Sequence, residues 1–162
     1  MTIKIGDRLP DATFTVMTAD GPAPKTTNDI FSGRKVVLFA VPGAFTPTCH
    51  RNHMPGFVNN ADAIKAKGVD AIAVTAVNDV FVMNAWAEAC GGKGSIEFLA
   101  DGSGAFAKAL GLSMDLSERG LGLRSKRYAM VVEDGAVTHL GLDETPGKVE
   151  SASAEQVLSA LG

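Results

Sequence analysis

Short apolar runs rich in β-branched residues alternate with helix-length segments through most of this chain. A run of that kind is typical of a buried strand when turn residues bound it. The predicted strands cover 12–16, 35–41, 69–77 and 96–100. The predicted helices cover 47–66, 79–89 and 103–111. Strands that alternate with helices favour an α/β domain in which helices flank a central mixed sheet.

Proline, glycine and capping residues set the expected helix boundaries. Pro55 lies inside the helix over 47–66, so a kink is predicted near it, and Gly68 is placed to end that helix. Asn78 or Asp79 is the expected N-cap of the next helix. The apolar positions that follow helical spacing there are Phe81, Val82, Ala85 and Trp86.

The segments between these elements carry turn signals. The Gly-Pro-Ala-Pro run at 21–24 predicts a turn, and the glycine-rich, charged stretch 112–125 predicts a long surface loop. Asp134-Gly135 lies between two apolar runs, which indicates a β-hairpin. Ser153 resembles the first residue of a capping box. The helix that it opens covers Val157, Leu158 and Leu161.

The composition and charge are those of a globular protein that binds neither nucleic acid nor a membrane surface. Its 162 residues suffice for a single domain over 1–162 that buries a core without disulfides. A formal net charge of -3 argues against a nucleic acid or a membrane surface as partner. The sequence contains no transmembrane-length apolar stretch and no signal-peptide segment at its start. With two cysteines and no export signal, a reducing cytoplasm is the expected compartment.

The segment after the strand over 35–41 places one of the two cysteines in a reactive position. Thr46 is a favourable helix N-cap, and Pro47 suits the first helical position. Cys49 then falls in the first turn, where backbone N–H groups lack intrahelical partners and the helix dipole is positive. A thiolate is stabilised at such a position and is nucleophilic. The sequence therefore predicts that the chemistry of this chain begins at Cys49.

The residues around that cysteine resemble a known family. The run 42–49, Pro-Gly-Ala-Phe-Thr-Pro-Thr-Cys, resembles the active-site signature of the peroxiredoxins, and in particular of the type II or peroxiredoxin 5 group. Further matches at 77–83, 100–104 and 120–128 follow in the family's order. The resemblance implies a thioredoxin-like fold and a thiol-dependent peroxidase of antioxidant defence and cell redox homeostasis. Its substrates would be hydrogen peroxide and alkyl hydroperoxides, and no cofactor is expected.

The resemblance also implies a role for each matching residue. Cys49 corresponds to the peroxidatic cysteine, whose thiolate attacks a peroxide oxygen and becomes a sulfenic acid. Thr46 corresponds to the threonine whose hydroxyl can donate to the thiolate and accept from the peroxide. Arg127 corresponds to the arginine that places a fixed cation beside the sulfur and the peroxide oxygens. Pro42 corresponds to the proline that shields the pocket from water.

Backbone N–H groups complete the expected substrate-binding set. The N–H of Cys49, together with that of Gly43 or Ala44, is placed to bind the peroxide oxygens as negative charge develops. Arg124 lies close to Arg127 in the sequence. Arg124 is the alternative candidate for the cation beside the sulfur, or else it pairs with an acidic side chain.

A thiol to reduce the sulfenic acid is missing from the positions where the family carries one. Mammalian members have this resolving cysteine near the C-terminus, where 150–153 reads Glu-Ser-Ala-Ser, and plant members have it where this chain has Val74. Cys90 matches neither position. A bystander thiol is its favoured interpretation, and a resolving cysteine the alternative. One-cysteine chemistry is therefore predicted, in which glutathione with glutaredoxin, or thioredoxin, recycles Cys49. The resemblance further implies a homodimer.

Three other functions use the same thiol. Cys49 and His53 lie one helical turn apart, with His50 as a third possible metal ligand, but zinc sites need more ligands at recognised spacings, and no metal is expected. The Thr46-x-x-Cys49 turn resembles that of a dithiol oxidoreductase whose first cysteine is replaced, which removes dithiol exchange. A non-enzymatic redox sensor or holdase remains compatible with the sequence.

Overall fold

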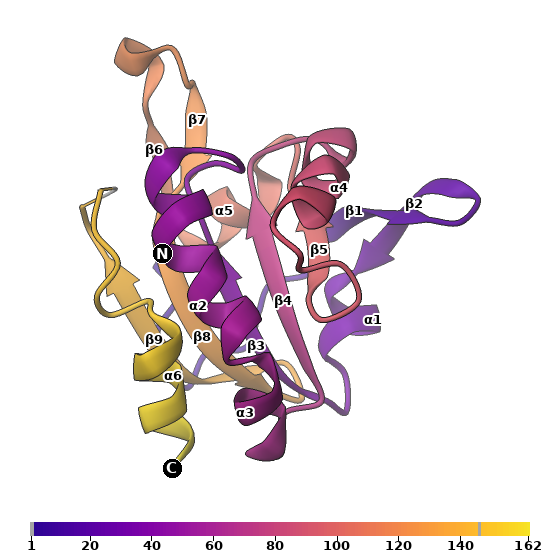
Figure 1. The fold of residues 1–162 in the computed structure, drawn as a ribbon, viewed down its shortest axis with the longest axis vertical. Helices are drawn as coiled ribbons and strands as arrows, with labels where there is room; N and C mark the ends of the chain where they lie inside the picture. Colours follow the sequence, from indigo (N-terminus) through magenta and orange to yellow (C-terminus); the bar gives the residue numbers. More distant parts are fainter. Residues whose placement is uncertain (1, 146) are drawn as a thin grey trace.

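The computed structural model describes residues 2–145 and 147–162. Its main strands are β1 Thr13–Thr18, β2 Gly21–Thr26, β3 Lys35–Ala40, β4 Ala71–Ala76, β5 Glu97–Ala100, β8 Arg127–Glu133 and β9 Ala136–Asp143. They form one sheet in the order β2-β1-β5-β4-β3-β8-β9 (Figure 1). The neighbours β3, β4 and β5 are parallel, and the other pairings are antiparallel. The mixed central sheet predicted from the sequence is confirmed.

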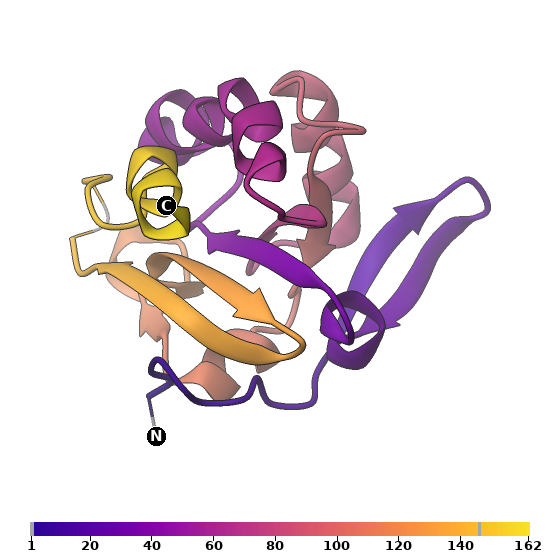
Figure 2. The same ribbon diagram turned by 90° about the horizontal axis from the view of Figure 1, so that it is seen from below.

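Helices cover both faces of this sheet (Figure 2). One face carries α2 Met54–Asn59, α3 Ala61–Ala66, α4 Val80–Ala89 and α6 Ala154–Leu161, and the other carries α1 Thr27–Phe31 and α5 Ala105–Leu110. Val37 and Phe39 of β3 enter the first core, while Val36 and Leu38 enter the second. A strand buried on both faces is apolar throughout, which explains why β3 shows no polar alternation. No helix in the described residues is both long and apolar enough to cross a membrane.

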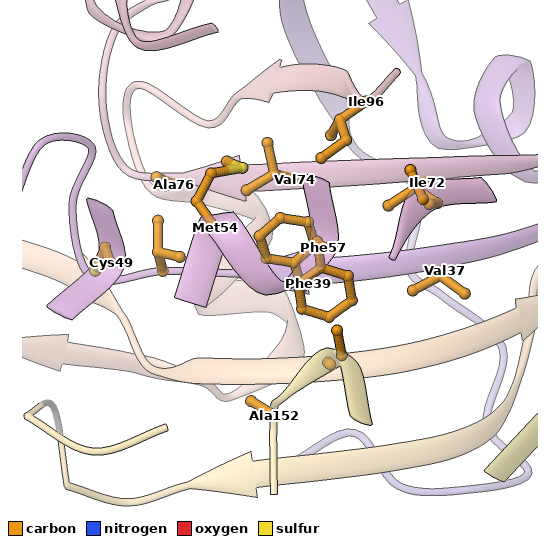
Figure 3. Close-up of a cluster of buried hydrophobic side chains, with 14 of the residues drawn as sticks. Val37, Phe39, Cys49, Met54, Phe57, Ile72, Val74, Ala76, Ile96 and Ala152 are labelled. Carbon is orange, nitrogen blue, oxygen red and sulfur yellow. The ribbon is translucent and has the colours of Figure 1, made fainter. Parts of the chain in front are cut away.

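The core under α2 supports the segment that carries the reactive cysteine (Figure 3). The rings of Phe39 and Phe57 stack with centroids 4.0 Å apart. Cys49 and Met54 belong to the same cluster, and none of these four side chains is more than 1% exposed. Burying one such apolar side chain contributes about 1.5–3 kcal/mol to stability. The segment from Cys49 to Phe57 is therefore firmly anchored to the sheet.

The helix predicted over 47–66 is present, but it is interrupted twice. It begins at Pro47 and passes through a π-helical turn, η1 (Cys49–His53), before α2 begins. Pro55 follows directly, as the second residue of α2, and it has no N–H to donate to the preceding turn. Because that N–H is absent, the turn before it cannot keep regular α-helical bonding, and the predicted kink takes the form of a widened turn. A second break, at Asn60, separates α2 from α3.

Two connecting segments differ from the prediction. The run 21–24, expected as a turn, lies in β2, and the turn itself occupies 19–20. Pro22 and Pro24 are tolerated in β2 because it is an edge strand, where one side of the backbone needs no N–H donor to a neighbouring strand. The stretch 112–125, expected as a surface loop, contains a second, two-stranded sheet made of β6 (Ser113–Asp115) and β7 (Leu123–Ser125). This hairpin, with the turn between its strands, extends beyond the main sheet (Figure 1).

The helix α4 begins as predicted, but its buried side is different. Asp79, one of the two expected caps, accepts a hydrogen bond from the N–H of Val82 at 2.8 Å. Phe81 is 65% exposed and Ala85 is also exposed, so the expected apolar face is wrong at both positions. The residues that α4 buries are Val80, Met83, Trp86 and Ala87.

Turn and cap signals elsewhere give mixed outcomes. The hairpin at Asp134-Gly135 is confirmed, with φ values of 47° and 81°. Ser153 caps α6 as expected, by accepting from a backbone N–H. Ser103 does not begin α5, which starts at Ala105. The free N–H groups of its first turn, those of Phe106 and Ala107, donate to the carboxylate of Asp101. The short helix α1, opened by a capping box at Thr26, lies outside the predicted elements.

Candidate active site

The turn after β3 places Cys49 at the start of a helix, beneath the surface. The chain turns through Phe45, whose φ of 66° is one that a bulky residue adopts only when its surroundings hold it there. The Phe45 ring stacks on His50, with centroids 5.7 Å apart. The carbonyl of Thr46 accepts a helical hydrogen bond from the N–H of His50 at 2.8 Å. Cys49 therefore lies in the first turn, as predicted, and is only 1% exposed.

Two arginines approach this turn, and Arg127 is the one that reaches the sulfur. It is the first residue of β8, beside β3 in the sheet, and it is 1% exposed. Its Nη2 donates to the Sγ of Cys49 at 3.1 Å. Arg124 instead donates to the carbonyls of Leu121 and Pro42, at 2.8 and 3.2 Å. A cation buried as deeply as Arg127 requires hydrogen-bond acceptors beside it, and the sulfur of Cys49 is one of them.

His53 holds the other arm of the same guanidinium. Its Nδ1 lies 2.7 Å from Nη1 of Arg127, and its Nε2 lies 2.7 Å from the carbonyl oxygen of Ala152. Arg127 can only donate and the carbonyl can only accept, so the ring must carry its proton on Nε2 and accept at Nδ1. Burial, with the Arg127 charge, lowers the pKa of His53 to about 3. A neutral histidine therefore orients the arginine on the sulfur.

The remaining predicted pocket residues lie around the same turn. The hydroxyl of Thr46 donates to the carbonyl of Gly43 at 2.6 Å, so its O–H is not directed at the sulfur. The N–H of Ala44 donates to Oδ1 of Asn78 at 2.9 Å. Of the two alternatives, Gly43 and Ala44, the N–H of Ala44 is therefore already bonded and not free to donate to a peroxide. Pro42 is buried, with its carbonyl held by Arg124.

The two histidines proposed as metal ligands are committed to other partners. Both ring nitrogens of His53 form the hydrogen bonds described above. The Nδ1 of His50 accepts from the indole N–H of Trp86 at 2.9 Å. The described residues contain no group of three or more metal-binding side chains. The geometry therefore assigns His53 to the arginine, a role that its spacing from Cys49 alone does not reveal.

The thiol of Cys90 is bonded outside this arrangement, because it donates to the carbonyl of Ala87 in α4. Cys90 caps the C-terminal end of the ten-residue helix α4, a length of about 15 Å. Asn78, which binds the active-site turn, lies at the opposite end of that helix. Burial raises the pKa of the Cys90 thiol, which disfavours the reactive thiolate. Both cysteines are free thiols in the structure. These features support the bystander interpretation of Cys90.

The depressed pKa of His53 predicts a loss of stability in mild acid. In the unfolded chain a histidine titrates near pH 6.5, whereas folded His53 stays neutral down to about pH 3. Below about pH 6.5 the unfolded state therefore binds one more proton. The free energy of unfolding should fall by up to about 1.4 kcal/mol per pH unit through this window. Urea unfolding at several pH values should show this slope, and the slope should be shallower in His53→Gln. Equal slopes in the two proteins would contradict the assignment.

Known proteins similar to this chain carry peroxiredoxin names. The family model described as Redoxin matches residues 4–158. Peroxiredoxin-2E-2, chloroplastic, of Oryza sativa subsp. japonica is 51% identical over 165 residues, which cover 99% of this chain and 73% of that protein. Peroxiredoxin-2C of the same organism is 46% identical over 160 residues, which cover 98% of each.

Solved structures give the same picture. Reduced Prx3 of Vibrio vulnificus in complex with H₂O₂ superposes with a TM-score of 0.94 at 50% identity, covering 99% of this chain and 100% of the other. Peroxiredoxin 5 of Alvinella pompejana gives a TM-score of 0.86 at 34% identity, covering 98% and 97%. These matches confirm the thioredoxin-like peroxiredoxin fold. The chain therefore belongs to the redoxin family, as a type II, peroxiredoxin 5-like peroxiredoxin, and it is a thiol-dependent peroxidase.

Proposed function

We propose that Cys49 is the peroxidatic cysteine of this peroxidase and that Arg127, Thr46 and Pro42 complete its pocket. The observation that carries the proposal is the 3.1 Å hydrogen bond from Nη2 of Arg127 to the Cys49 sulfur, with both residues 1% exposed. A buried guanidinium beside a thiol at a helix start favours the thiolate, which is the nucleophilic form of cysteine.

The first step transfers one oxygen atom to that sulfur. The Cys49 thiolate attacks the terminal oxygen of a hydroperoxide, an S–O bond forms, and the O–O bond breaks. The sulfur becomes a sulfenic acid, and the departing alkoxide or hydroxide takes up a proton to leave as alcohol or water. Negative charge moves from sulfur to the leaving oxygen during this step. The Arg127 guanidinium, fixed beside the sulfur, stabilises that charge throughout.

Thr46 and the turn backbone orient the peroxide in this proposal. The Thr46 O–H is committed to the carbonyl of Gly43, which leaves the lone pairs of the hydroxyl oxygen to accept from the peroxide O–H. Donation from Thr46 to the thiolate would require its hydroxyl to turn. Because the Ala44 N–H is bound to Asn78, Gly43 and Cys49 are the better backbone donors to the peroxide oxygens. Pro42 keeps water from one side of the sulfur.

An external thiol regenerates Cys49 in our proposal. Glutathione attacks the sulfenic sulfur, water leaves, and a mixed disulfide forms; a second thiol, from glutathione or glutaredoxin, then releases the cysteine. Thioredoxin is the other reductant of the same chemical class. The disfavoured thiolate of Cys90 supports this one-cysteine route. We further propose a homodimer, on the family resemblance, and a cytoplasmic location, on the presence of only two cysteines in the sequence.

Mass spectrometry of both cysteines tests the one-cysteine route. After one equivalent of peroxide, Cys49 should carry a sulfenic acid, and added glutathione should convert it to a glutathione adduct. Cys90→Ser should turn over peroxide as the wild type does, because Cys90 takes no part. A disulfide between Cys49 and Cys90, formed before glutathione is added, would overturn this route. Repeated turnover with glutathione would distinguish a catalyst from a sensor that is oxidised only once.

A further inference from the structure

We infer that Asp143 and the segment 150–152, here called the C-terminal strap, are positioning elements of the active site. Through Ala152 and His53 they hold Arg127 on the sulfur of Cys49. The inference rests on the proposed roles of Cys49 and Arg127. It extends the site to residues for which the sequence predicts no positioning role and which lie about a hundred positions from Cys49.

The Asp143 carboxylate fixes the strap by three hydrogen bonds. It accepts from the backbone N–H groups of Glu150, Ser151 and Ala152, at 3.0, 2.9 and 3.0 Å. Asp143 is 8% exposed and Ala152 is fully buried. Charge-assisted hydrogen bonds are about twice as strong as neutral ones. A carboxylate that accepts from three consecutive N–H groups therefore restrains this backbone more tightly than neutral hydrogen bonds within a loop would.

The strap is also fitted closely against β9. A Cβ atom built on Gly141 would overlap the carbonyl oxygen of Ser151, so the absence of a side chain at Gly141 lets the two backbones meet. In the β8–β9 hairpin, Asp143 lies directly opposite Arg127. One end of this hairpin therefore carries both Asp143, which binds the strap, and Arg127, which binds the sulfur.

The strap reaches the arginine through a single histidine tautomer. Ala152 donates its N–H to Asp143 and offers its carbonyl to Nε2 of His53 at 2.7 Å. That carbonyl requires a proton on Nε2, and the proton on Nε2 leaves a lone pair on Nδ1 for the Arg127 Nη1 donor at 2.7 Å. If the carbonyl moved away, the proton could shift to Nδ1 and oppose the arginine. Asp143 therefore acts on the sulfur without touching it.

Kinetics of Asp143 variants give the first test. Asp143→Asn keeps one acceptor oxygen but loses the charge, and Asp143→Ala removes the clamp. We expect the rate of Cys49 oxidation by hydrogen peroxide to fall about tenfold or more in Asp143→Ala, with a smaller loss in Asp143→Asn. The matched control is Glu144→Gln, an exposed neighbour whose partner is the surface residue Lys126. Gly141→Ala, which displaces the strap and leaves Asp143 in place, should slow the same step.

A spectroscopic readout separates positioning from general damage. In protein labelled with nitrogen-15 histidine, His53 should show the Nε2–H tautomer, with its signals assigned through His53→Gln. Asp143→Asn should mix the tautomers while circular dichroism stays native. In the His53→Gln background, Asp143→Asn should cause little further loss of rate, because it acts through His53. An unchanged tautomer, or fully additive losses in the double variant, would overturn the inference. Turnover that persists in Cys49→Ser would instead overturn the proposed function.

Discussion

Cys49→Ser is expected to abolish peroxide consumption. A serine hydroxyl stays protonated near neutral pH and forms no sulfenic acid, so the oxygen-transfer step loses its nucleophile. The guanidinium of Arg127 can still donate to the new hydroxyl, which is smaller than the sulfur and causes no clash. The fold should therefore survive. Peroxide consumption with glutathione as reductant measures the effect, and thermal unfolding checks that the variant is native.

Cys90→Ser is the matched control for this result. It removes the other thiol of the chain, which lies half-buried at the end of α4. Full activity in Cys90→Ser beside none in Cys49→Ser would assign the chemistry to one sulfur. Substantial residual turnover in Cys49→Ser would remove the central assignment, because no other thiol in the described residues lies against a buried cation.

Arg127→Gln is expected to slow the peroxide step by at least tenfold, which corresponds to about 1.4 kcal/mol of transition-state stabilisation. The charge on the guanidinium faces the sulfur at 3.1 Å, and glutamine offers one neutral donor in its place. Stopped-flow oxidation of Cys49 by hydrogen peroxide measures this step apart from the thiol recycling. The variant should also be less stable, because the Nδ1 of His53 loses its charged donor.

Arg124→Gln separates the two arginines of this region. Arg124 binds the backbone carbonyls of Leu121 and Pro42 and not the sulfur, so its loss should slow the peroxide step less than the loss of Arg127. A normal rate in Arg127→Gln together with a large loss in Arg124→Gln would transfer the catalytic cation to Arg124.

The strands and the reactive turn could be predicted because local chemistry decides them. The run at 36–41 is apolar without alternation and rich in β-branched residues, which is typical of a strand buried on both faces. Asp134-Gly135 supplies the left-handed residues of a tight hairpin. The turn predicted at 21–24 is wrong because prolines are also compatible with a strand when that strand lies at a sheet edge. Sheet position is a property of the whole fold, and no window of sequence contains it.

The site shows the same division between local and long-range information. The position of Cys49 in a first helical turn follows from local rules, and Arg127 follows from the family resemblance. The capping role expected of Thr46 is not observed, because its hydroxyl donates to the carbonyl of Gly43. The histidine that holds the arginine was visible only as a possible metal ligand, because its true partners are Arg127 and Ala152, 74 and 99 positions away. The prediction that Phe81 is buried is wrong for a related reason. Helical spacing shows which residues share one side of a helix, but not which of them face the sheet.

The hydrogen bond between Trp86 and His50 gives the protein an optical reporter of its own. Trp86 is the only tryptophan in the sequence, and its fully buried indole donates to the residue directly after Cys49. Indole emission is sensitive to hydrogen bonding and to nearby charge. Any displacement of the π-helical turn when the sulfur changes oxidation state will alter that emission. Intrinsic fluorescence is therefore a dye-free probe of whether this turn moves during the redox cycle.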